Sequence, residues 1–433
     1  MKKTNKIPEL LAPAGDLEKL KYAFDYGADA VYLGLPAYSL RAQTGFDMKS
    51  IGVGIKYAHK LDKKVYVTIN IFAHNRHIKE LPTYLRQLKK LNPDAVILSD
   101  LGVLMLIKKY LPKVKIHLST QANTLNSEAV KFWHKQGVSR IILGREVSLK
   151  DIKEIHQTVP KMELEVFVHG AMCMSYSGRC YLSAWLNSRS ANLGLCTQPC
   201  RWEYKIFLEE GLRPGQMIPI EADDKGTYIM NSKDLCLIDY LDELKKAGVM
   251  SFKIEGRTKS IYYLATVVKA YRQAFQRITQ NTKHKTHNKD LKLELDKIDN
   301  RGYTTGFLLG NEVGRQEFKT SKAMSDWEFV GEIVKIDNYS LAVIPRERSD
   351  RGDPVESENF LQTIFIKVHN VLKLGDEVEI MTPSENYKVK IKELINEKGD
   401  KVKSAHGGTK EIFKIEIPVQ YDIVEKSLIR KKK

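Results

Sequence analysis

The chain has 433 residues, of which 42% are hydrophobic and 28% charged, and its formal net charge is +17. This is the composition of a globular protein, and because one domain usually spans roughly 100 to 200 residues, the length predicts two or three domains. The positive charge favours a polyanionic partner, with a solvated basic surface as the alternative. No apolar run approaches the roughly 20 residues of a membrane helix, and no apolar stretch of a signal peptide follows the basic start. We therefore expect a soluble, cytoplasmic protein that does not bind membranes.

Short apolar runs alternate with amphipathic segments from residue 8 to about residue 257. Eight runs are candidate strands: Glu9–Pro13, Ala30–Leu35, Lys64–Asn70, Ala95–Asp100, Lys115–Thr120, Arg140–Gly144, Glu163–Val168 and Ser251–Glu255. The segments between them include helix-like stretches with apolar residues three and four apart: Leu17–Tyr26, Ile51–Leu61, Glu80–Leu91, Ser127–Gln136 and Leu149–Val159. Almost wholly apolar strands that alternate with helices indicate a parallel sheet covered by helices. Eight such units predict an α/β fold, a closed (β/α)8 TIM-like barrel.

The loops after the strands of such a barrel carry its chemistry. Polar residues stand at these positions: Gly15-Asp16, Gly34, Asn70, Asp100, Thr120-Gln121, Arg145-Glu146, His169-Gly170 and Glu255-Gly256-Arg257. The longest insertion follows strand seven and spans residues 170–236. We take His169 at the end of that strand, Glu165 within it, and Glu255 and Arg257 after strand eight as candidate catalytic groups for proton or anion handling.

The character of the sequence changes after the barrel. Residues 1–278 form the predicted catalytic domain, and residues 279–325 are a polar linker with a helical or crossing segment. From residue 326 to 433, runs alternate between apolar and polar residues with turns between them, which predicts a small all-β barrel domain. The basic end, Arg430 to Lys433, is expected to be a solvated tail.

The insertion after strand seven holds four of the five cysteines. Six residues separate Cys173 from Cys180, fifteen separate Cys180 from Cys196, three separate Cys196 from Cys200, and Cys236 stands apart. Clustered cysteines in a reducing compartment are more often metal ligands or redox groups than disulfides. The spacing matches neither a zinc ribbon nor a short ferredoxin run, so an iron–sulfur cluster, a zinc ion and unligated thiols all stay open.

The segment Glu165-x-Phe-x-His-Gly-Ala-Met-Cys173-Met-x-x-Ser-Gly-x-Cys180-x-Leu-Ser183 resembles the signature of peptidase family U32, the collagenase-like proteins. Supporting segments are Glu9-Leu-Leu-Ala-Pro-Ala-Gly15, Gly27-Ala-Asp-Ala-Val-Tyr-Leu-Gly34, Ser119-Thr-Gln-Ala-Asn123 and Lys253-Ile-Glu-Gly-Arg257. Within the family, Cys196-x-x-x-Cys200-Arg-Trp and Asn231-Ser-Lys-Asp-Leu235 are most similar to the tRNA hydroxylation proteins.

This resemblance implies an enzyme that converts the wobble uridine of tRNA to 5-hydroxyuridine without molecular oxygen, with prephenate as the small-molecule hydroxyl donor. It also implies a [4Fe–4S] cluster on Cys173, Cys180, Cys196 and Cys200, although Cys236 could replace Cys200 as a ligand. Beyond tRNA, a homo-oligomer or a hetero-oligomer with a related family member is a possible assembly.

Two alternatives remain. One is a collagenase-like peptidase, metal-dependent and with zinc bound, which is less favoured because the sequence has no water-activating motif and no export signal. The other is an RNA-binding or assembly factor in which the cysteines hold a structural metal.

Overall fold

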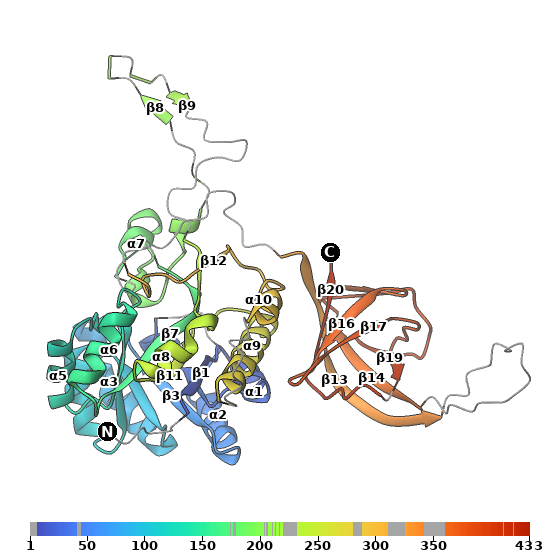
Figure 1. The fold of residues 1–433 in the computed structure, drawn as a ribbon, viewed down its shortest axis with the longest axis horizontal. Coiled ribbons are helices and arrows are strands. Elements are labelled where there is room, and N and C mark those ends of the chain that lie inside the picture. Colours follow the sequence, from blue (N-terminus) through green and yellow to red (C-terminus); the bar gives the residue numbers. More distant parts are fainter. Residues whose placement is uncertain are drawn as a thin grey trace, which may run out of the picture. The chain divides into compact units, whose positions relative to one another are not determined.

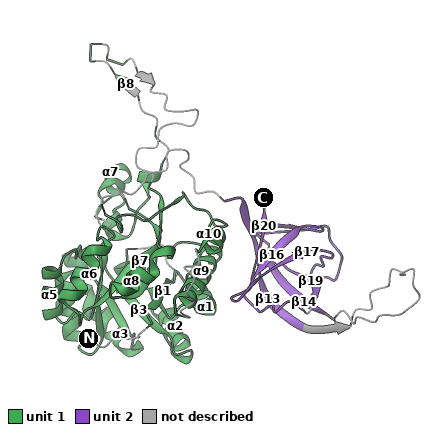
Figure 2. Ribbon diagram, in the orientation of Figure 1, with its two compact units in different colours: residues 1–324 green, residues 325–433 purple. Residues whose placement is uncertain are grey.

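The computed structural model describes residues 7–40, 45–173, 175, 179–202, 204, 207–209, 211–212, 214–215, 217–219, 232–279, 288–310, 325–341, 360–409, 411–418 and 420–433. The chain divides into two compact units, residues 1–324 and 325–433 (Figure 2). In the described part of the chain, no helix is long and apolar enough to cross a membrane.

The first unit is a closed barrel of eight parallel strands, as predicted. The strands are β1 (Glu9–Pro13), β2 (Ala30–Leu33), β3 (Lys64–Ile69), β4 (Ala95–Leu98), β5 (Lys115–Leu118), β6 (Arg140–Ile142), β7 (Glu163–Ala171) and β11 (Val249–Ile254). They pair in this order, and β11 closes the barrel because it pairs in parallel with both β1 and β7. Ser251 of β11 lies opposite Glu9 on one side and Glu165 on the other.

Helices cover the outside of the barrel (Figure 1). They are α1 (Leu17–Asp25), α2 (Met48–Lys60), α3 (Asn75–Leu91), α4 (Leu101–Tyr110), α5 (Ser127–Lys135), α6 (Leu149–Thr158), α8 (Leu241–Lys246), α9 (Ile261–Thr279) and α10 (Lys289–Leu295). Several begin at a capping side chain: Asp16, Asp47, Asp100 and Ser148 each accept a hydrogen bond from the backbone N–H three residues later. Each capping residue marks the point at which the loop after a strand ends and the next helix begins.

The seventh strand is longer than the sequence indicated. It continues past the predicted end at Val168 to Ala171, because a short strand, β10 (Asp234–Cys236), pairs with it in antiparallel fashion. A two-residue strand, β12 (Tyr303–Thr304), in turn pairs with β10. The insertion that begins after β7 and the chain that returns from it are therefore held side by side at the end of the barrel.

The second unit is an antiparallel β domain. Its six-stranded sheet has the order β17 (Asn386–Lys390), β16 (Glu377–Met381), β20 (Leu428–Lys432), β13 (Trp327–Leu341), β14 (Phe360–Val368) and β19 (Ile412–Pro418), and β15 (Val371–Lys373) pairs with β18 (Ser404–His406). Aliphatic side chains such as Val330, Ile364 and Ile380 form its core.

The basic end of the chain is not the solvated tail that the sequence suggested. It forms β20 between β16 and β13, and the side chain of Arg430 is fully buried. The guanidinium of Arg430 pairs with Glu379 of the neighbouring strand, which neutralises a charge that burial would otherwise make very unfavourable.

Candidate functional site at the carboxyl end of the barrel

The inside of the barrel carries a cluster of charged side chains. Glu165 is fully buried, and its two carboxylate oxygens each accept a hydrogen bond from a different cation, Lys253 at 2.9 Å and Arg140 at 3.1 Å. Arg140 also pairs with Glu9 at 2.7 Å. Burial alone would lower the pKa of Arg140, but the carboxylates of Glu9 and Glu165 outweigh it and hold that pKa well above its usual range. Glu165 thus acts in this structure as the counter-charge that holds two buried cations in place.

Within this cluster, Lys253 is the member nearest the carboxyl ends of the strands, two residues after Ser251 on β11. Its ammonium nitrogen is 4.3 Å from the ring centre of Tyr32 and 5.3 Å from that of Phe167, so aromatic faces take the place of water around it. Burial lowers the pKa of Lys253, against the opposing effect of Glu165. The interior of the barrel next to the candidate site therefore contains a buried lysine, Lys253, whose ion-pair partner is Glu165.

Glu255 and Arg257 meet around the same tyrosine at the mouth of the barrel. The Tyr32 hydroxyl lies 3.3 Å from Glu255 Oε2, and the Arg257 guanidinium is 5.6 Å from the Tyr32 ring centre. Arg257 is buried and donates to the hydroxyls of Ser39 and Thr68. The structure thus brings two of the four predicted catalytic residues together.

Further polar groups follow neighbouring strands. The Asn70 amide nitrogen lies 3.3 Å from both Ser119 Oγ and Gln121 Oε1. The guanidinium of Arg145 lies 3.9 Å from the Phe167 ring centre, and its Nε is buried without a hydrogen-bond partner among the described residues. These amide, hydroxyl and guanidinium groups line the end of the barrel at which chemistry is expected.

The sequence singled out Asn70, Gln121 and Arg145 as residues after strands, whereas Ser119 and Phe167 stood only within the segments of the family resemblance and Ser39 and Thr68 were not singled out. Thr68 and Phe167 lie inside strands, at positions that alternate toward the barrel interior. Thr68 stands two residues before Asn70 and Phe167 two before His169, so counting back by two from these polar residues would have found them.

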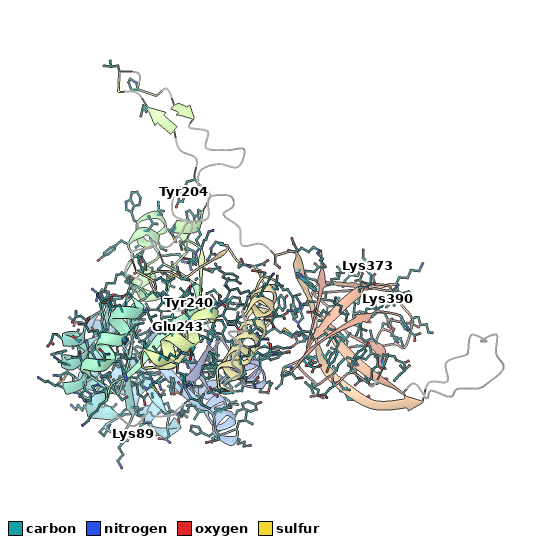
Figure 3. The ribbon with its side chains drawn as sticks, viewed as in Figure 1. Lys89, Tyr204, Tyr240, Glu243, Lys373 and Lys390 are labelled. Carbon is teal, nitrogen blue, oxygen red and sulfur yellow. The ribbon has the colours of Figure 1, made fainter. Side chains whose placement is uncertain are left out.

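The cysteine segment is attached to this mouth. Arg179 donates to the Gln121 carbonyl at 3.2 Å, and the backbone N–H of Phe72 donates to the Asn192 carbonyl at 3.2 Å. The segment contains a short helix, α7 (Leu182–Asn187), and two 3₁₀ turns, η4 (Ala191–Leu193) and η5 (Pro199–Arg201). Tyr204 follows η5 and donates to the Pro199 carbonyl at 2.7 Å (Figure 3).

The thiols of Cys173, Cys180 and Cys196 each lie close enough to Cys200 to act on its charge. Cys173 and Cys196 are exposed, and Cys180 and Cys200 are half-buried. Burial raises the pKa of the Cys200 thiol while Arg201 opposes that rise, and the thiols of Cys173, Cys196 and Cys180 add to it. A backbone N–H also donates to a sulfur, from Gln198 to Cys196 at 3.3 Å. Cys200 with a nearby arginine and Cys196 with an N–H donor are suited to act as thiolate ligands of a cluster.

Cys236 lies elsewhere. It is buried on β10 opposite His169, the Tyr271 hydroxyl lies 3.7 Å from its sulfur, and burial raises the pKa of its thiol. Among the residues that the structure describes, no three His, Cys, Asp or Glu side chains are placed to hold a single metal ion. A [4Fe–4S] cluster differs from a single ion in that each of its four irons takes one thiolate, so its ligands stand farther apart.

His169 is enclosed by tyrosines. Its ring centre is 5.5 Å from that of Tyr271, 5.6 Å from that of Tyr303 and 6.0 Å from that of Tyr263. Burial, together with the nearby charge of Lys259, lowers the pKa of His169 to about 3. The imidazole is therefore neutral at ordinary pH, and its ring contacts are with Tyr263 and Tyr271 of α9 and Tyr303 of β12.

Arg201, which follows Cys200 in the chain, lies near two further cations, Arg301 and Lys259. Arg301 is buried, donates to the Ser232 carbonyl at 3.1 Å and pairs with Asp234. Burial lowers the pKa of both Arg301 and the half-buried Lys259, and the charge of Arg201 lowers both further. Cations held near one another attract an anion, and Asp234 neutralises part of their charge.

A separate cavity of about 220 Å³ lies at the other end of the barrel. It is lined by residues from the amino ends of the strands, among them Glu9, Lys64, His117, Arg140 and Glu163. Because the chemistry of such barrels takes place at the carboxyl ends of the strands, this cavity is not part of the candidate site.

Comparison with known proteins agrees with this architecture. The model of peptidase family U32 matches residues 15–317, and that of the peptidase family U32 C-terminal domain matches residues 354–430. The chain is 39% identical to tRNA hydroxylation protein P of Escherichia coli (strain K12), over 96% of this chain and 94% of that protein. It is 36% identical to tRNA hydroxylation protein P1 of Bacillus subtilis (strain 168), over 92% and 90% respectively. It is 31% identical to the 23S rRNA 5-hydroxycytidine C2501 synthase of Escherichia coli (strain K12), over 87% of this chain and 56% of that protein.

Proposed function

The chain belongs to peptidase family U32, and on that premise we propose that it hydroxylates the wobble uridine of tRNA to 5-hydroxyuridine, without molecular oxygen and with a cysteine-bound iron–sulfur cluster. The observation that carries the proposal is the position of four thiols on a segment bonded to the mouth of the barrel. The names of relatives that act on tRNA and rRNA support an RNA substrate. A cytoplasmic location follows from a tRNA substrate.

Cys173, Cys180, Cys196 and Cys200 would hold the cluster, and Cys236 would not, because it is buried against His169. Such a cluster supplies one-electron redox chemistry when bound. Burial raises the pKa of Cys200, and Arg201 next to it partly offsets that rise in favour of the thiolate form that a ligand needs.

The mouth of the barrel would receive the base. Asn70 and Gln121 offer amide groups that can pair with the polar edge of uracil, and the Arg145 guanidinium on Phe167 offers a planar surface. An RNA base must leave its stack to reach such a site. The buried cations below keep the site rigid through their bonds to Glu165.

The hydroxyl donor would lie beside the thiols. Prephenate carries two carboxylates, and Arg201 and Arg301 supply positive charge near Cys200, with Lys259 close to both arginines. His169 would not serve as a general acid in this scheme, because its pKa is lowered to about 3 and its imidazole is neutral. It would instead be a neutral polar group beside Lys259. Among the predicted catalytic residues, Glu255 and Arg257 both contact Tyr32, and the Glu255 backbone N–H donates to the His169 carbonyl at 2.9 Å.

Two measurements test the proposal. Protein purified without oxygen should contain iron and sulfide, and neither would be found if the cysteines hold no cluster. Mass spectrometry of tRNA nucleosides should show 5-hydroxyuridine in the wild type and its loss in a deletion strain. Unchanged nucleosides with intact RNA binding would instead support the assembly-factor alternative. Sedimentation of the full chain, alone and with a related family member, tests the predicted oligomer.

The alternative of a zinc-dependent, collagenase-like peptidase rests on the name of the family. It gains nothing from the described residues, since none of them form a three-ligand group for a metal ion. Cleavage of collagen that chelators abolish and zinc restores would revive it.

A further inference from the structure

We propose that Tyr181 and Trp185, here called the aromatic face, form a stacking surface for unpaired nucleotides of the RNA that flank the reacting base. The inference rests on the proposed function and names the surface on which its substrate is held.

Both side chains are unusually exposed for their size. Tyr181 is 81% exposed and Trp185 is 79% exposed. They are four residues apart at the start of α7, where the Trp185 backbone N–H donates to the Tyr181 carbonyl at 2.8 Å, so they lie on the same side of the helix. Single exposed apolar residues are common, but two adjacent large aromatic side chains in water mark an interaction site.

The opposite side of α7 is fixed to the segment that carries the thiols. Ser183 is fully buried, and its hydroxyl contacts Thr197 Oγ1 at 3.0 Å and accepts from the Thr197 backbone N–H at 3.0 Å. Asn187 donates to the same Thr197 hydroxyl at 2.6 Å. Ser183 and Asn187 are also four residues apart, about half a helical turn from the aromatic pair. These bonds hold Tyr181 and Trp185 outward, while Thr197 lies between Cys196 and Cys200 in the chain.

The charge around the aromatic face favours an anionic partner. Residues 166–202 include three arginines and no aspartate or glutamate. Arg179 and Arg189 are exposed on either side of α7 in the chain, and Trp202, which is 42% exposed, follows Arg201. Aromatic rings interleaved with arginine suit single-stranded nucleic acid, whose bases stack on rings while its phosphates pair with guanidinium groups. In duplex RNA the faces of the bases are covered by stacking on their neighbours. The partner is therefore an unpaired loop, whose bases can stack on the aromatic side chains.

The test uses the full-length protein, purified without oxygen, and two RNA probes of equal charge: an anticodon stem-loop and a blunt duplex of the same length. Trp185→Ala should weaken stem-loop binding roughly fivefold to 100-fold, which is the range for loss of one base-stacking contact. Trp185→Phe should retain most of the affinity because it keeps a ring. Duplex binding should not change. The matched control is Met105→Ala, because Met105 is 66% exposed on α4, outside this segment.

Stem-loop binding by Trp185→Ala equal to the wild type would overturn the inference, and so would an equal loss for stem-loop and duplex. A change in self-association without a change in RNA affinity would reassign the aromatic face to a protein interface and overturn it as well. Unchanged circular dichroism and iron content show that the variant is folded and loaded. If deletion of the gene leaves tRNA nucleosides unchanged but Trp185→Ala still loses stem-loop affinity, the proposed hydroxylation fails and the aromatic face stands.

Discussion

Replacement of Glu165 by Gln tests whether the charged cluster inside the barrel is held together as described. Glu165 is fully buried and bonds to Lys253 at 2.9 Å and Arg140 at 3.1 Å. Removal of one partner of a buried ion pair typically costs about 3–5 kcal/mol, because the other charge is left without compensation. Arg140 keeps Glu9 and Glu163 as partners, so the loss falls mainly on Lys253. We therefore expect Glu165→Gln to lower the free energy of unfolding of the first unit by about 3 kcal/mol.

The assay is chemical denaturation of the full chain, followed by circular dichroism at several pH values. Burial already lowers the pKa of Lys253 in the wild type, so the unfolded state binds more protons below the ordinary pKa of lysine. Stability therefore rises as pH rises through that window, and the rise should start at lower pH in Glu165→Gln, where no carboxylate opposes the shift. The double variant Glu165→Gln/Lys253→Met removes both charges and should recover much of the loss. A single variant as stable as the wild type, or a double variant no more stable than the single one, would refute the reasoning.

Three further predictions concern other parts of the chain. Gly170→Ala should destabilise the barrel mouth and reduce hydroxylation, because Gly170 has a φ of +114° and an added Cβ would lie 2.7 Å from the Glu255 carbonyl oxygen; denaturation and nucleoside analysis measure the two effects. His169, with its pKa lowered from 6.5 to about 3, should make the protein lose stability on acidification between these values, since the unfolded state binds the proton first; pH-dependent denaturation of the wild type and His169→Phe gives the comparison. Glu379→Gln should destabilise the second unit by roughly 3 kcal/mol because Arg430 is fully buried, and a denaturation midpoint equal to that of the wild type would contradict this.

The barrel could be predicted from sequence because its signals are local. Each strand is a short apolar run, and the amphipathic period between runs marks a helix. The strands β10 and β12 were not found, since they have three and two residues and exist only through pairing with the extended end of β7. Propensity carries no information about such non-local pairing.

The candidate site was predictable in its parts but not in its contacts. Position after a strand pointed to Arg257 and Glu255, and the cysteine spacing pointed to the segment above them. The sequence could not show that Glu165 is neutralised by Lys253, 88 residues away, or that His169 faces tyrosines on the side of α9. Alternation along a strand tells which side a residue faces, but not which charge it will meet there. The burial of Arg430 was missed for the same reason, because its partner Glu379 lies on another strand.

The central proposal is that Cys173, Cys180, Cys196 and Cys200 would hold a cluster that the hydroxylation of tRNA requires, while Cys236 would not take part. The most direct measurement is mass spectrometry of tRNA nucleosides from a deletion strain that carries the wild-type gene, Cys173→Ala or Cys236→Ala, with iron measured in each purified protein. Cys173 is exposed and its thiol acts on that of Cys200, whereas Cys236 is buried opposite His169. The account predicts that Cys173→Ala loses both iron and 5-hydroxyuridine and that Cys236→Ala keeps both. Retention of iron and 5-hydroxyuridine by Cys173→Ala would contradict it.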